Sequence, residues 1–392
     1  MNDEASRDAD RESGADGRAT QESAPGGSAR AELLLPSRDL HADLAFFRER
    51  LGFRLDSIFP ADDPAQAVLS GHGVRIRLER GAAEVPGAIR LHCEDPSALG
   101  NGEQDLLAPN GTRIELRDLH PRLQRPPTLH ALVVQRQGAK GGAWVVGRAG
   151  MHYRDLIPGR LGGAIIASHI RIPEAGPVPD DVHYHIAAFQ LIFCYRGWVD
   201  LVYEDQGPPF RLDTGDCLIQ PPQIRHRVLE SSAGLEVIEI AVPAEHLTAL
   251  DHTLELPTDH LRPQRDFGGQ RFCRHMARDA VWSPARLPGF SACDTGIAAA
   301  TGGLANAQVA RRAGGGSDAA ETSHDADILF TFVLEGEMTL RVPESETCAL
   351  RAGDAFVLPP GLHSAYERCT DGLELLEVSL PGAFATTIHR SP

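Results

Sequence analysis

The C-terminal two thirds of the chain contain an internal repeat, and this repeat limits the possible folds more than any other feature. The segments GWVDLVYEDQGPPFRLDTGDCLIQPPQIRH and GEMTLRVPESETCALRAGDAFVLPPGLH share a strand, a polar turn, an L-x-x-Gly-Asp turn and a Pro pair. Aligning Gly215 with Gly353 gives an offset of 138 residues. Aligning His185 with His324 gives 139, and two agreeing offsets indicate a duplication. Each copy has many short alternating strands and no long helical pattern, so we predict two small antiparallel barrels or jelly rolls.

Two histidines precede the first repeat segment, in the stretch HYHIAAFQ that runs from His183 to Gln190. Residues i and i+2 of a β-strand point the same way, so His183 and His185 would offer two imidazoles to one metal ion. The repeat segment supplies a third imidazole, His226, after a Pro pair that fixes the start of its strand. Three neutral imidazoles suit Fe, Zn, Ni, Cu or Mn and leave coordination positions open. The alternative is a set of ordinary barrel histidines that bind no metal.

The ordered set of histidines and Gln190 resembles the two sequence motifs of the cupin superfamily. The spacing matches throughout, with Gln190 in place of the usual Glu and Gln223 in place of a Gly. The resemblance implies that His183, His185 and His226 are the metal ligands. A neutral amide at Gln190 could be a weak ligand, or could hydrogen-bond and orient a bound oxygen or the substrate. Three-histidine sites without the Glu are familiar in this superfamily among Fe(II) dioxygenases that cleave C–C bonds.

The resemblance covers roughly residues 145 to 385 and implies a mainly β chain with two tandem cupin barrels. The first, at residues 145–250, would hold one divalent metal ion, with Fe(II) favoured and Zn, Mn, Ni and Cu as alternatives. The second, at residues 251–392, would carry a degenerate site. The function implied is a non-haem Fe(II) dioxygenase acting on a small oxygen-chelating aromatic or dicarbonyl substrate. Two alternatives stay open: a non-catalytic bicupin that binds or senses a small molecule, and a metal-dependent isomerase or hydrolase.

The second copy has lost most of the ligand positions. Thr322 and His324 stand where the H-x-H pair would be, and Leu329 takes the Glu position. His363 comes one residue early, which leaves Ser364 at the expected ligand position. A slip of one residue turns a side chain to the opposite face of a strand, so we predict that this barrel binds no metal. Its role would be packing or the binding of a small molecule.

Four further residues are weaker candidates for the lining of the pocket. His169 and Arg171 lie on one side of the strand ASHIRI, where they would either face a substrate anion or form a surface pair. Ile192 and Cys194 continue the strand parity of Gln190 and would face the pocket. Cys194 is expected to be a small apolar wall residue rather than a nucleophile.

Upstream of the barrels, the chain reads as a small α+β module at residues 31–120. Asp39 is a candidate N-cap, and Gly52 is placed to end the helix. Between them, apolar residues recur at the spacing of an α-helix and would form an apolar stripe on one face. Its members are Leu40, Leu44, Phe47 and Leu51. Strands are expected on both sides of the helix, in the order βαβββ, with GTRIELRD as a further strand.

The stretches SRDLHADLAFFRERLGF and APNGTRIELRD resemble one module of the vicinal oxygen chelate superfamily, which includes glyoxalase and bleomycin-resistance proteins. The resemblance places the family's metal ligands at Glu32 and Glu115. The first position is usually His, and the family's cup needs two facing modules where the sequence indicates one. The alternative is a module kept for dimerisation or packing, with Glu115 an ordinary strand residue.

Charge and composition limit the partners and the compartment. The formal net charge is −16, from 38 Lys and Arg against 54 Asp and Glu, which argues against nucleic acid or an anionic membrane as a partner. Residues 1–30 lack an apolar core, so we expect a disordered tail and no secretory signal. Seven scattered cysteines fit reduced thiols in the cytoplasm. Residues 121–144 read as a linker, and open barrel edges favour a homodimer that binds a small-molecule substrate.

Overall fold

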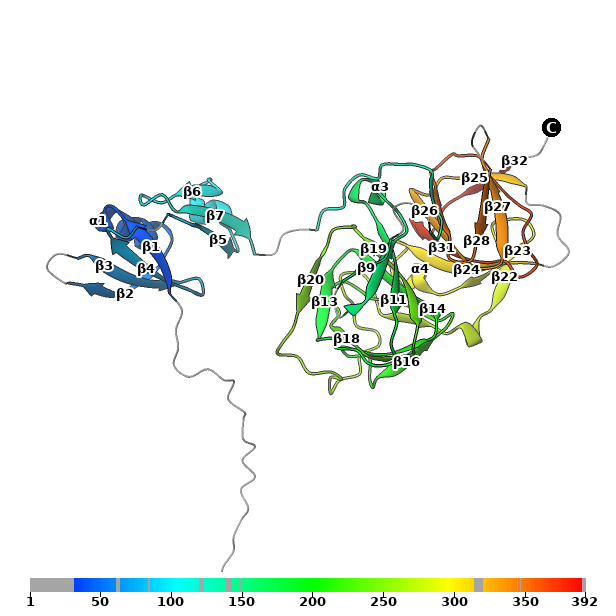
Figure 1. Cartoon of the computed structure of the whole chain (residues 1–392), viewed down its shortest axis with the longest axis horizontal. Helices are drawn as coiled ribbons and strands as arrows, with labels where there is room; N and C mark the ends of the chain where they lie inside the picture. The colour runs from blue at the N-terminus through cyan, green and yellow to red at the C-terminus, as the bar shows by residue number, and fades with distance from the viewer. Residues whose placement is uncertain are drawn as a thin grey trace, which may run out of the picture. The chain divides into compact units, whose positions relative to one another are not determined.

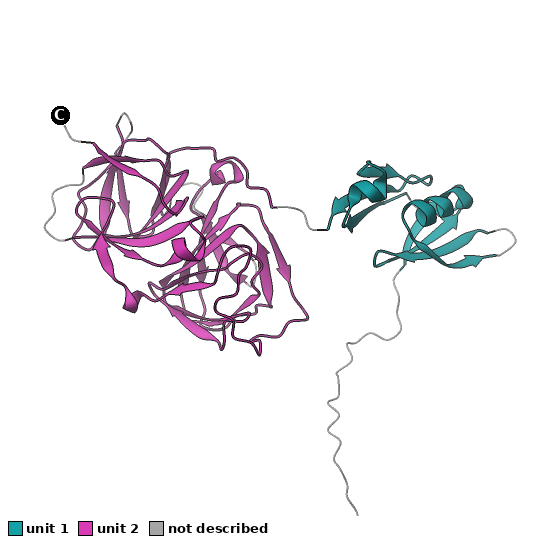
Figure 2. Ribbon diagram, turned by 180° about the vertical axis from the view of Figure 1, so that it is seen from behind, with its two compact units in different colours: residues 1–122 teal, residues 123–392 magenta. Residues whose placement is uncertain are grey.

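The structure is a computed structural model that describes residues 32–60, 64–83, 85–119, 123–138, 143–147, 150–313, 320–343, 345 and 347–389. The expected tail at residues 1–30 lies outside this part of the chain. The chain divides into two compact units, residues 1–122 and 123–392 (Figure 2). Each unit is described by itself.

The N-terminal unit begins with a four-stranded sheet in the order β1-β4-β3-β2 and a helical segment packed on it. The side chain of Asp39 accepts a hydrogen bond from the Ala42 amide, which caps the helix as predicted. All four members of the apolar stripe are buried, and Gly52 follows the helix with φ +72°. The elements are β1 (Leu33–Ser37), α1 (Leu40–Ala45), η1 (Phe46–Arg50), β2 (Arg54–Phe59), β3 (Gln66–Gly71) and β4 (Val74–Arg80).

A second, three-stranded sheet with the order β5-β7-β6 completes this unit. Both sheets contribute to one core, since Leu69 and Ile76 of the first sheet cluster with Ile114 and Leu116 of the second. The strand GTRIELRD therefore belongs to a second strand-helix-strand-strand unit, which the sequence did not reveal because its helix and middle strand are short. The elements are β5 (Ala88–Cys93), α2 (Pro96–Gly100), β6 (Asp105–Leu107) and β7 (Arg113–Asp118).

The C-terminal unit contains two β-barrels, so the prediction of a mainly β chain is confirmed (Figure 1). In the first barrel, a seven-stranded sheet of order β21-β17-β14-β19-β11-β10-β9 is joined by a sheet of order β16-β15-β18-β13-β20, with β12 paired to β18. No helix in the described part of the chain has the length and apolar character needed to cross a bilayer. The elements are β9 (Val145–Val146), β10 (His152–Asp155), α3 (Arg160–Gly163), β11 (Ile166–Ile172), β12 (Gly176–Pro177), β13 (His183–Ile186), β14 (Phe189–Arg196), β15 (Trp198–Tyr203), β16 (Phe210–Asp213), β17 (Cys217–Ile219), β18 (His226–Ser231), β19 (Leu235–Val242), β20 (Leu247–Leu250) and β21 (Cys273–His275).

The second barrel repeats the first strand by strand. Its large sheet has the order β22-β23-β24-β31-β26-β29-β8, and smaller sheets of order β28-β27-β30 and β25-β32 complete it. The duplication seen in the sequence is thus a duplication of topology. The elements are β8 (Val133–Gln135), η3 (Ala277–Asp279), β22 (Trp282–Pro284), β23 (Phe290–Asp294), α4 (Ile297–Ala300), β24 (Asn306–Arg312), β25 (Glu321–His324), β26 (Ile328–Glu335), β27 (Glu337–Arg341), β28 (Cys348–Arg351), β29 (Ala355–Leu358), β30 (Ala365–Glu367), β31 (Glu374–Leu380) and β32 (Thr386–His389).

The two barrels exchange their flanking strands. Strand β8, which precedes the first barrel, pairs with β29 of the second, and β21, which precedes the second barrel, pairs with β17 of the first. The Asp of each repeated Gly-Asp turn anchors the incoming segment: Asp354 accepts from the Gln137 amide and Asp216 from the Ala277 amide. The expected linker at residues 121–144 therefore contains the barrel strand β8, and β21, inside the range expected for the second barrel, pairs with the first.

The large sheets of the two barrels pack against each other through one shared hydrophobic core. On β14, Phe189, Leu191 and Phe193 belong to this shared core, whereas Cys194 belongs to the separate core inside the first barrel. Both faces of the large sheet are therefore buried. Odd-numbered residues of β14 face the other barrel and even-numbered residues face the barrel interior, which determines which side chains can reach the pocket.

Candidate metal centre

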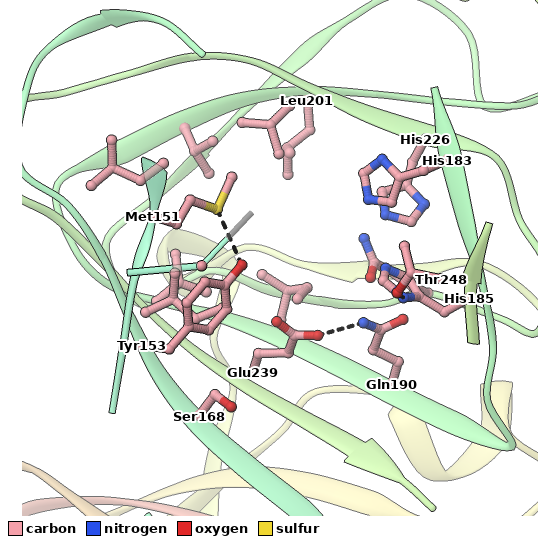
Figure 3. Close-up of a pocket in the computed structure, with 18 of the residues that line it drawn as sticks. Met151, Tyr153, Ser168, His183, His185, Gln190, Leu201, His226, Glu239 and Thr248 are labelled. Atoms are coloured by element: carbon pink, nitrogen blue, oxygen red, sulfur yellow. Dashed lines mark hydrogen bonds between the residues drawn. The ribbon is translucent and has the colours of Figure 1, made fainter. Parts of the chain in front are cut away.

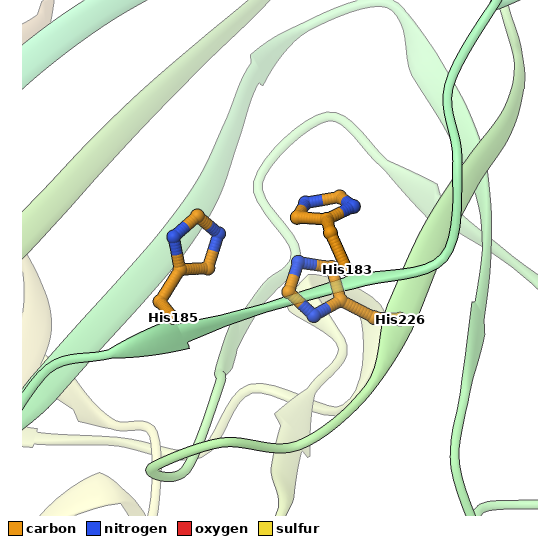
Figure 4. Close-up of side chains that lie close together, drawn as sticks. All are labelled: His183, His185 and His226. Atoms are coloured by element: carbon orange, nitrogen blue, oxygen red, sulfur yellow. The ribbon is translucent and has the colours of Figure 1, made fainter. Parts of the chain in front are cut away.

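Three histidines converge on neighbouring strands of the first barrel (Figure 4). His183 and His226 are direct cross-strand partners on β13 and β18, and His185 lies two residues further along β13. One ligand nitrogen from each histidine can be chosen so that all three lie within 4.8 Å of one another. His183 and His226 are buried and His185 is half-buried. The structure thus brings together the two residues that strand parity predicted and the third that the repeat segment supplied.

The Nδ1 atoms of all three rings have partners outside the cluster. His183 Nδ1 lies 2.8 Å from the carbonyl oxygen of Asp181, and His226 Nδ1 lies 3.0 Å from that of Ile224. A carbonyl oxygen only accepts, so both rings must donate from Nδ1 and keep the lone pair on Nε2. His185 Nδ1 is 2.9 Å from the hydroxyl of Thr248, a group that can both donate and accept. This donor set fits a divalent ion that prefers imidazole ligands.

Asp180 is a residue of the site that the sequence analysis missed. Its side chain is fully buried, and its carboxylate lies 3.6 Å from Nδ1 of His183. It also accepts a hydrogen bond from the backbone amide of Val228, at 2.9 Å, and so links the segment before β13 to β18. A carboxylate beside a ligating imidazole orients the ring and increases its basicity. The available signal was the acidic pair Asp180-Asp181, which is separated from the H-x-H stretch only by Val182.

The three histidines open onto a cavity of about 390 Å³ inside the first barrel (Figure 3). Figure 3 shows His183, His185 and His226 on one side of the cavity and Met151, Tyr153 and Leu201 across from them. The polar lining residues are Tyr153, Ser168, His183, His185, Gln190, Tyr203, Gln220, His226, Glu239, His246 and Thr248. The apolar ones, besides Gly147, are Met151, Ile166, Ile170, Ile172, Ile192, Val199, Leu201, Val228, Leu235 and Val237. The size and the mixture of walls suit a small organic ligand.

Gln190 lies in this cavity and is held there by a carboxyl group. Its side-chain amide donates a hydrogen bond of 2.6 Å to Oε1 of Glu239 on β19 (Figure 3). Glu239 was not anticipated from the sequence, although an acidic residue between Ile238 and Ile240 was a usable signal. The first barrel therefore has a carboxyl group near the centre, on a different strand from the one that carries Gln190.

The prediction that His169 and Arg171 face the pocket is wrong. The pocket side of β11 carries Ser168 and the even-numbered isoleucines, so the odd-numbered residues point away. His169 lies between the barrels, where its ring contacts Phe332 and bonds Glu236 at 2.8 Å, and Arg171 is exposed. Burial lowers the pKa of His169, and the hydrogen bond from its imidazole lowers that of Glu236.

The two β14 candidates divide between the pocket and the core. Ile192 lines the pocket, in agreement with its parity. Cys194 is buried in the core of the same barrel, and its thiol donates to the carbonyl of Gly197. Burial raises the pKa of Cys194 to about 12, which keeps it a thiol and fits the expectation that it is not a nucleophile.

The second barrel arranges the corresponding positions differently. His363 is exposed and bonds Glu321, while Ser364 is buried, as the slip of one residue predicts. His324 is buried and bonds the carbonyl of Leu358. The three-histidine group in the first barrel is the only cluster of metal-ligating side chains in the described part of the chain.

The duplicated strand β31 carries Glu377 at the position of Glu239. In register, Glu239 pairs with Ile192 and Glu377 pairs with Thr331 of the duplicated strand. Glu377 is bonded by Arg286 and by Gln308. An arginine therefore balances the buried carboxylate of the second barrel.

Glu32 and Glu115 of the N-terminal unit have arginine partners. Arg75 and Arg77 both bond Glu32, and Arg90 bonds Glu115 at 2.8 Å. These hydrogen bonds lower the pKa of both carboxyl groups. Neither belongs to a cluster of three or more metal-ligating residues among those that the structure describes. Glu32 and Glu115 form ion pairs with these arginines. The structure therefore gives no support to the expectation that they are metal ligands.

Comparisons with known proteins agree with this architecture. Residues 309–378 match the model of the cupin domain. A comparison with curated protein sequences gives no match. A salicylate 1,2-dioxygenase of Pseudoaminobacter salicylatoxidans, solved in complex with gentisate, is similar with a TM-score of 0.51 and 16% identity, over 68% of this chain and 88% of that chain. The oxalate decarboxylase of Lactobacillus farciminis, solved as a formate complex, has a TM-score of 0.48 and 14% identity, over 69% and 90% of the two chains. At these identities the likeness concerns the fold alone.

Proposed function

We propose that this chain, a two-barrel protein of the cupin superfamily, is a non-haem metal-dependent dioxygenase that acts on a small oxygen-chelating aromatic or dicarbonyl substrate. The observation that carries the proposal is the three-histidine cluster, whose Nδ1 atoms all have outside partners and whose rings face a cavity large enough for such a molecule. The favoured ion is Fe(II). When bound, it would supply the redox and Lewis-acid chemistry that a dioxygenase requires.

The side chains around the centre would position the substrate. Gln190 is oriented by Glu239, so its amide is available at a fixed place to hydrogen-bond a substrate oxygen. The apolar wall opposite the histidines would receive the body of the substrate and exclude water from it. We assign Gln190 a role in catalysis because it touches the space between the histidines and this wall.

We also propose roles for the second barrel and the N-terminal unit. We propose that the second barrel serves packing, that the N-terminal unit is a glyoxalase-like module used for packing or dimerisation, and that the protein is a cytoplasmic homodimer. The size-exclusion mass of the full chain, compared with that of residues 123–392, would test the role of the N-terminal unit in dimerisation.

Oxygen uptake and metal content test the function together. The full chain, loaded with Fe(II), is offered β-diketones, catechols, gentisate and salicylate in an oxygen electrode. We expect uptake with at least one of them and about one metal ion per chain in the first barrel. His185→Ala should lose both the ion and the uptake, whereas His363→Ala, its matched control in the second barrel, should keep both because His363 is exposed and bonds Glu321. A metal-loaded protein that consumes no oxygen with any compound would refute the proposal.

A further inference from the structure

A further cavity, of about 400 Å³, has walls from both barrels and is separate from the three-histidine pocket. The described residues that line the two cavities do not overlap. Tyr195 of β14 and Val309 of β24 contribute one side chain from each barrel. Cys293 of β23 also lines the cavity, and its sulfur lies 3.6 Å from Nε2 of His275 on the exchanged strand β21. The proposed function assigns no role to this cavity.

The duplication shows which side chains occupy the corresponding place in the other half of the unit. Arg154 of β10 pairs with His169 of β11, and Cys293 of β23 pairs with Val309 of β24. Cys293 therefore corresponds to Arg154, and Val309 corresponds to His169. Arg154 and His169 are buried and fill their place, whereas the smaller Cys293 and Val309 leave a cavity open.

The buried Arg154 shows which groups hold a guanidinium at such a place. Its Nη2 donates to the carbonyl oxygen of Gly353 at 2.7 Å, and its guanidinium carbon lies 5.9 Å from the ring centroid of Trp144. Burial lowers the pKa of Arg154, and the negative charges of Asp354 and Glu236 oppose this effect. A carbonyl oxygen, an indole ring and nearby carboxylates therefore replace the water that a guanidinium loses on burial.

Three counterparts of these groups line the cavity, namely Gly215, Trp282 and Glu374. Glu374 lies directly opposite Glu335 in the sheet. Burial raises the pKa of Glu374, and the negative charge of Glu335 raises it further. A cation bound in the cavity would reduce this repulsion, so the place that lacks an arginine still favours a positive charge.

Two exposed arginines, Arg196 and Arg311, also line the cavity, and the other half shows that such neighbours are compatible with a guanidinium. Arg171 is the counterpart of Arg311 and lies two residues further along the strand pair that buries Arg154. In register, Glu335 stands where the first barrel has Arg196. The cavity therefore has a carboxylate where its counterpart has a further cation.

We infer that the cavity between the barrels binds a ligand through a guanidinium group, which takes the place that Arg154 fills in the other half. The group donates to the carbonyl oxygen of Gly215 and to the carboxylate of Glu374, beside the Trp282 ring. This binding site goes beyond the proposed function, because it shares no described lining residue with the three-histidine pocket.

Calorimetric titration of the full chain with two matched pairs of compounds tests the inference. Phenylguanidine is paired with phenylurea, and the methylamide of N-acetylarginine is paired with that of N-acetylcitrulline. In each pair the two compounds have the same shape, and only the first is a cation. We expect at least one cation to bind, and to bind about tenfold or more tightly than its neutral partner, because Glu374 attracts the charge. The cation that binds more tightly identifies the source of the group as a small aryl compound or an arginine side chain.

Two variants with matched controls locate the site. Cys293→Arg supplies the missing guanidinium from the chain itself and should abolish binding, whereas Val281→Arg adds the same charge at a side chain that is 79% exposed and should change the affinity by less than about twofold. Glu374→Gln should weaken binding of the cation by about tenfold, whereas Glu337→Gln, at an exposed position of the same barrel, should not. Glu374→Gln removes a charge and keeps the size of the side chain, so it tests the site even if Cys293→Arg does not fold.

Three results would overturn the inference. If neither cation binds, the cavity is not a guanidinium site. If each neutral compound binds as tightly as its cation, the inferred ligand class is wrong. If a folded Cys293→Arg or Glu374→Gln variant binds the cation as tightly as the wild type, the ligand occupies another place in the molecule.

Discussion

The buried carboxylate of Asp180 accepts a hydrogen bond from the Val228 amide and lies beside the imidazole of His183. Two different substitutions of Asp180 separate these two roles. In Asp180→Ala, the backbone amide of Val228 loses its acceptor, and the free energy of unfolding without metal should fall by about 1–3 kcal/mol. Asp180→Asn keeps an oxygen for that amide and should be close to the wild type in stability. It loses the negative charge that lies 3.6 Å from His183 Nδ1, so its metal affinity should fall by about 10- to 100-fold.

Urea unfolding of the metal-free proteins and competition titration with a Zn²⁺ chelator measure the two effects separately. Asp181→Asn is the matched control, because that side chain is exposed and only its backbone carbonyl bonds His183. It should change neither quantity. If Asp180→Asn bound Zn²⁺ as tightly as the wild type, the carboxylate would have no role in positioning His183. If Asp180→Ala were as stable as the wild type, the link to β18 would be energetically unimportant.

Two further predictions concern stability. Gly197 has φ +80°, and a Cβ there would lie 2.3 Å from Oγ of Ser232, so Gly197→Ala should lower the free energy of unfolding by about 2–3 kcal/mol in urea. Gly234→Ala, with φ +65° and open space, should cost only about 1–2 kcal/mol, and equal costs would refute the steric argument. Burial lowers the pKa of His169, so the stability it contributes is present above its ordinary 6.5 and is lost as the pH falls through the lowered value in the folded protein. Between about pH 7.5 and 5 the melting temperature should therefore fall more steeply in the wild type than in His169→Gln, and parallel curves would contradict this. The pKa of Glu236 is also lowered, but the stability that this carboxylate contributes is lost only below its ordinary 4.5, outside that window.

The three-histidine cluster could be predicted because its signals are local. His183 and His185 are two residues apart on one strand, and the Gly and Pro residues of the repeat fix where His226 enters. Glu239 could not be assigned to the site in this way. Its partner Gln190 is 49 residues away in sequence, and only the pairing of β14 with β19 brings them together.

The wrong prediction for His169 has a different physical cause. Alternation of apolar and polar residues identifies the inward face of a strand only when the other face is exposed to solvent. Here the large sheet has the cavity on one side and the second barrel on the other, so both faces are buried. The sequence correctly indicated that His169 and Arg171 lie on the same face of β11. Nothing in the local sequence showed whether that face or the opposite one lines the pocket. Strands β8 and β21 were missed because each is only three residues long and has its partner in the other barrel.

The exchanged strands also bear on how the two barrels unfold. In each copy, the strand that precedes the barrel pairs with the other barrel, so neither large sheet is complete without the other half of the unit. We therefore expect the two barrels to unfold together as one cooperative unit. The second barrel thus supports the three-histidine barrel mechanically, whatever it binds itself.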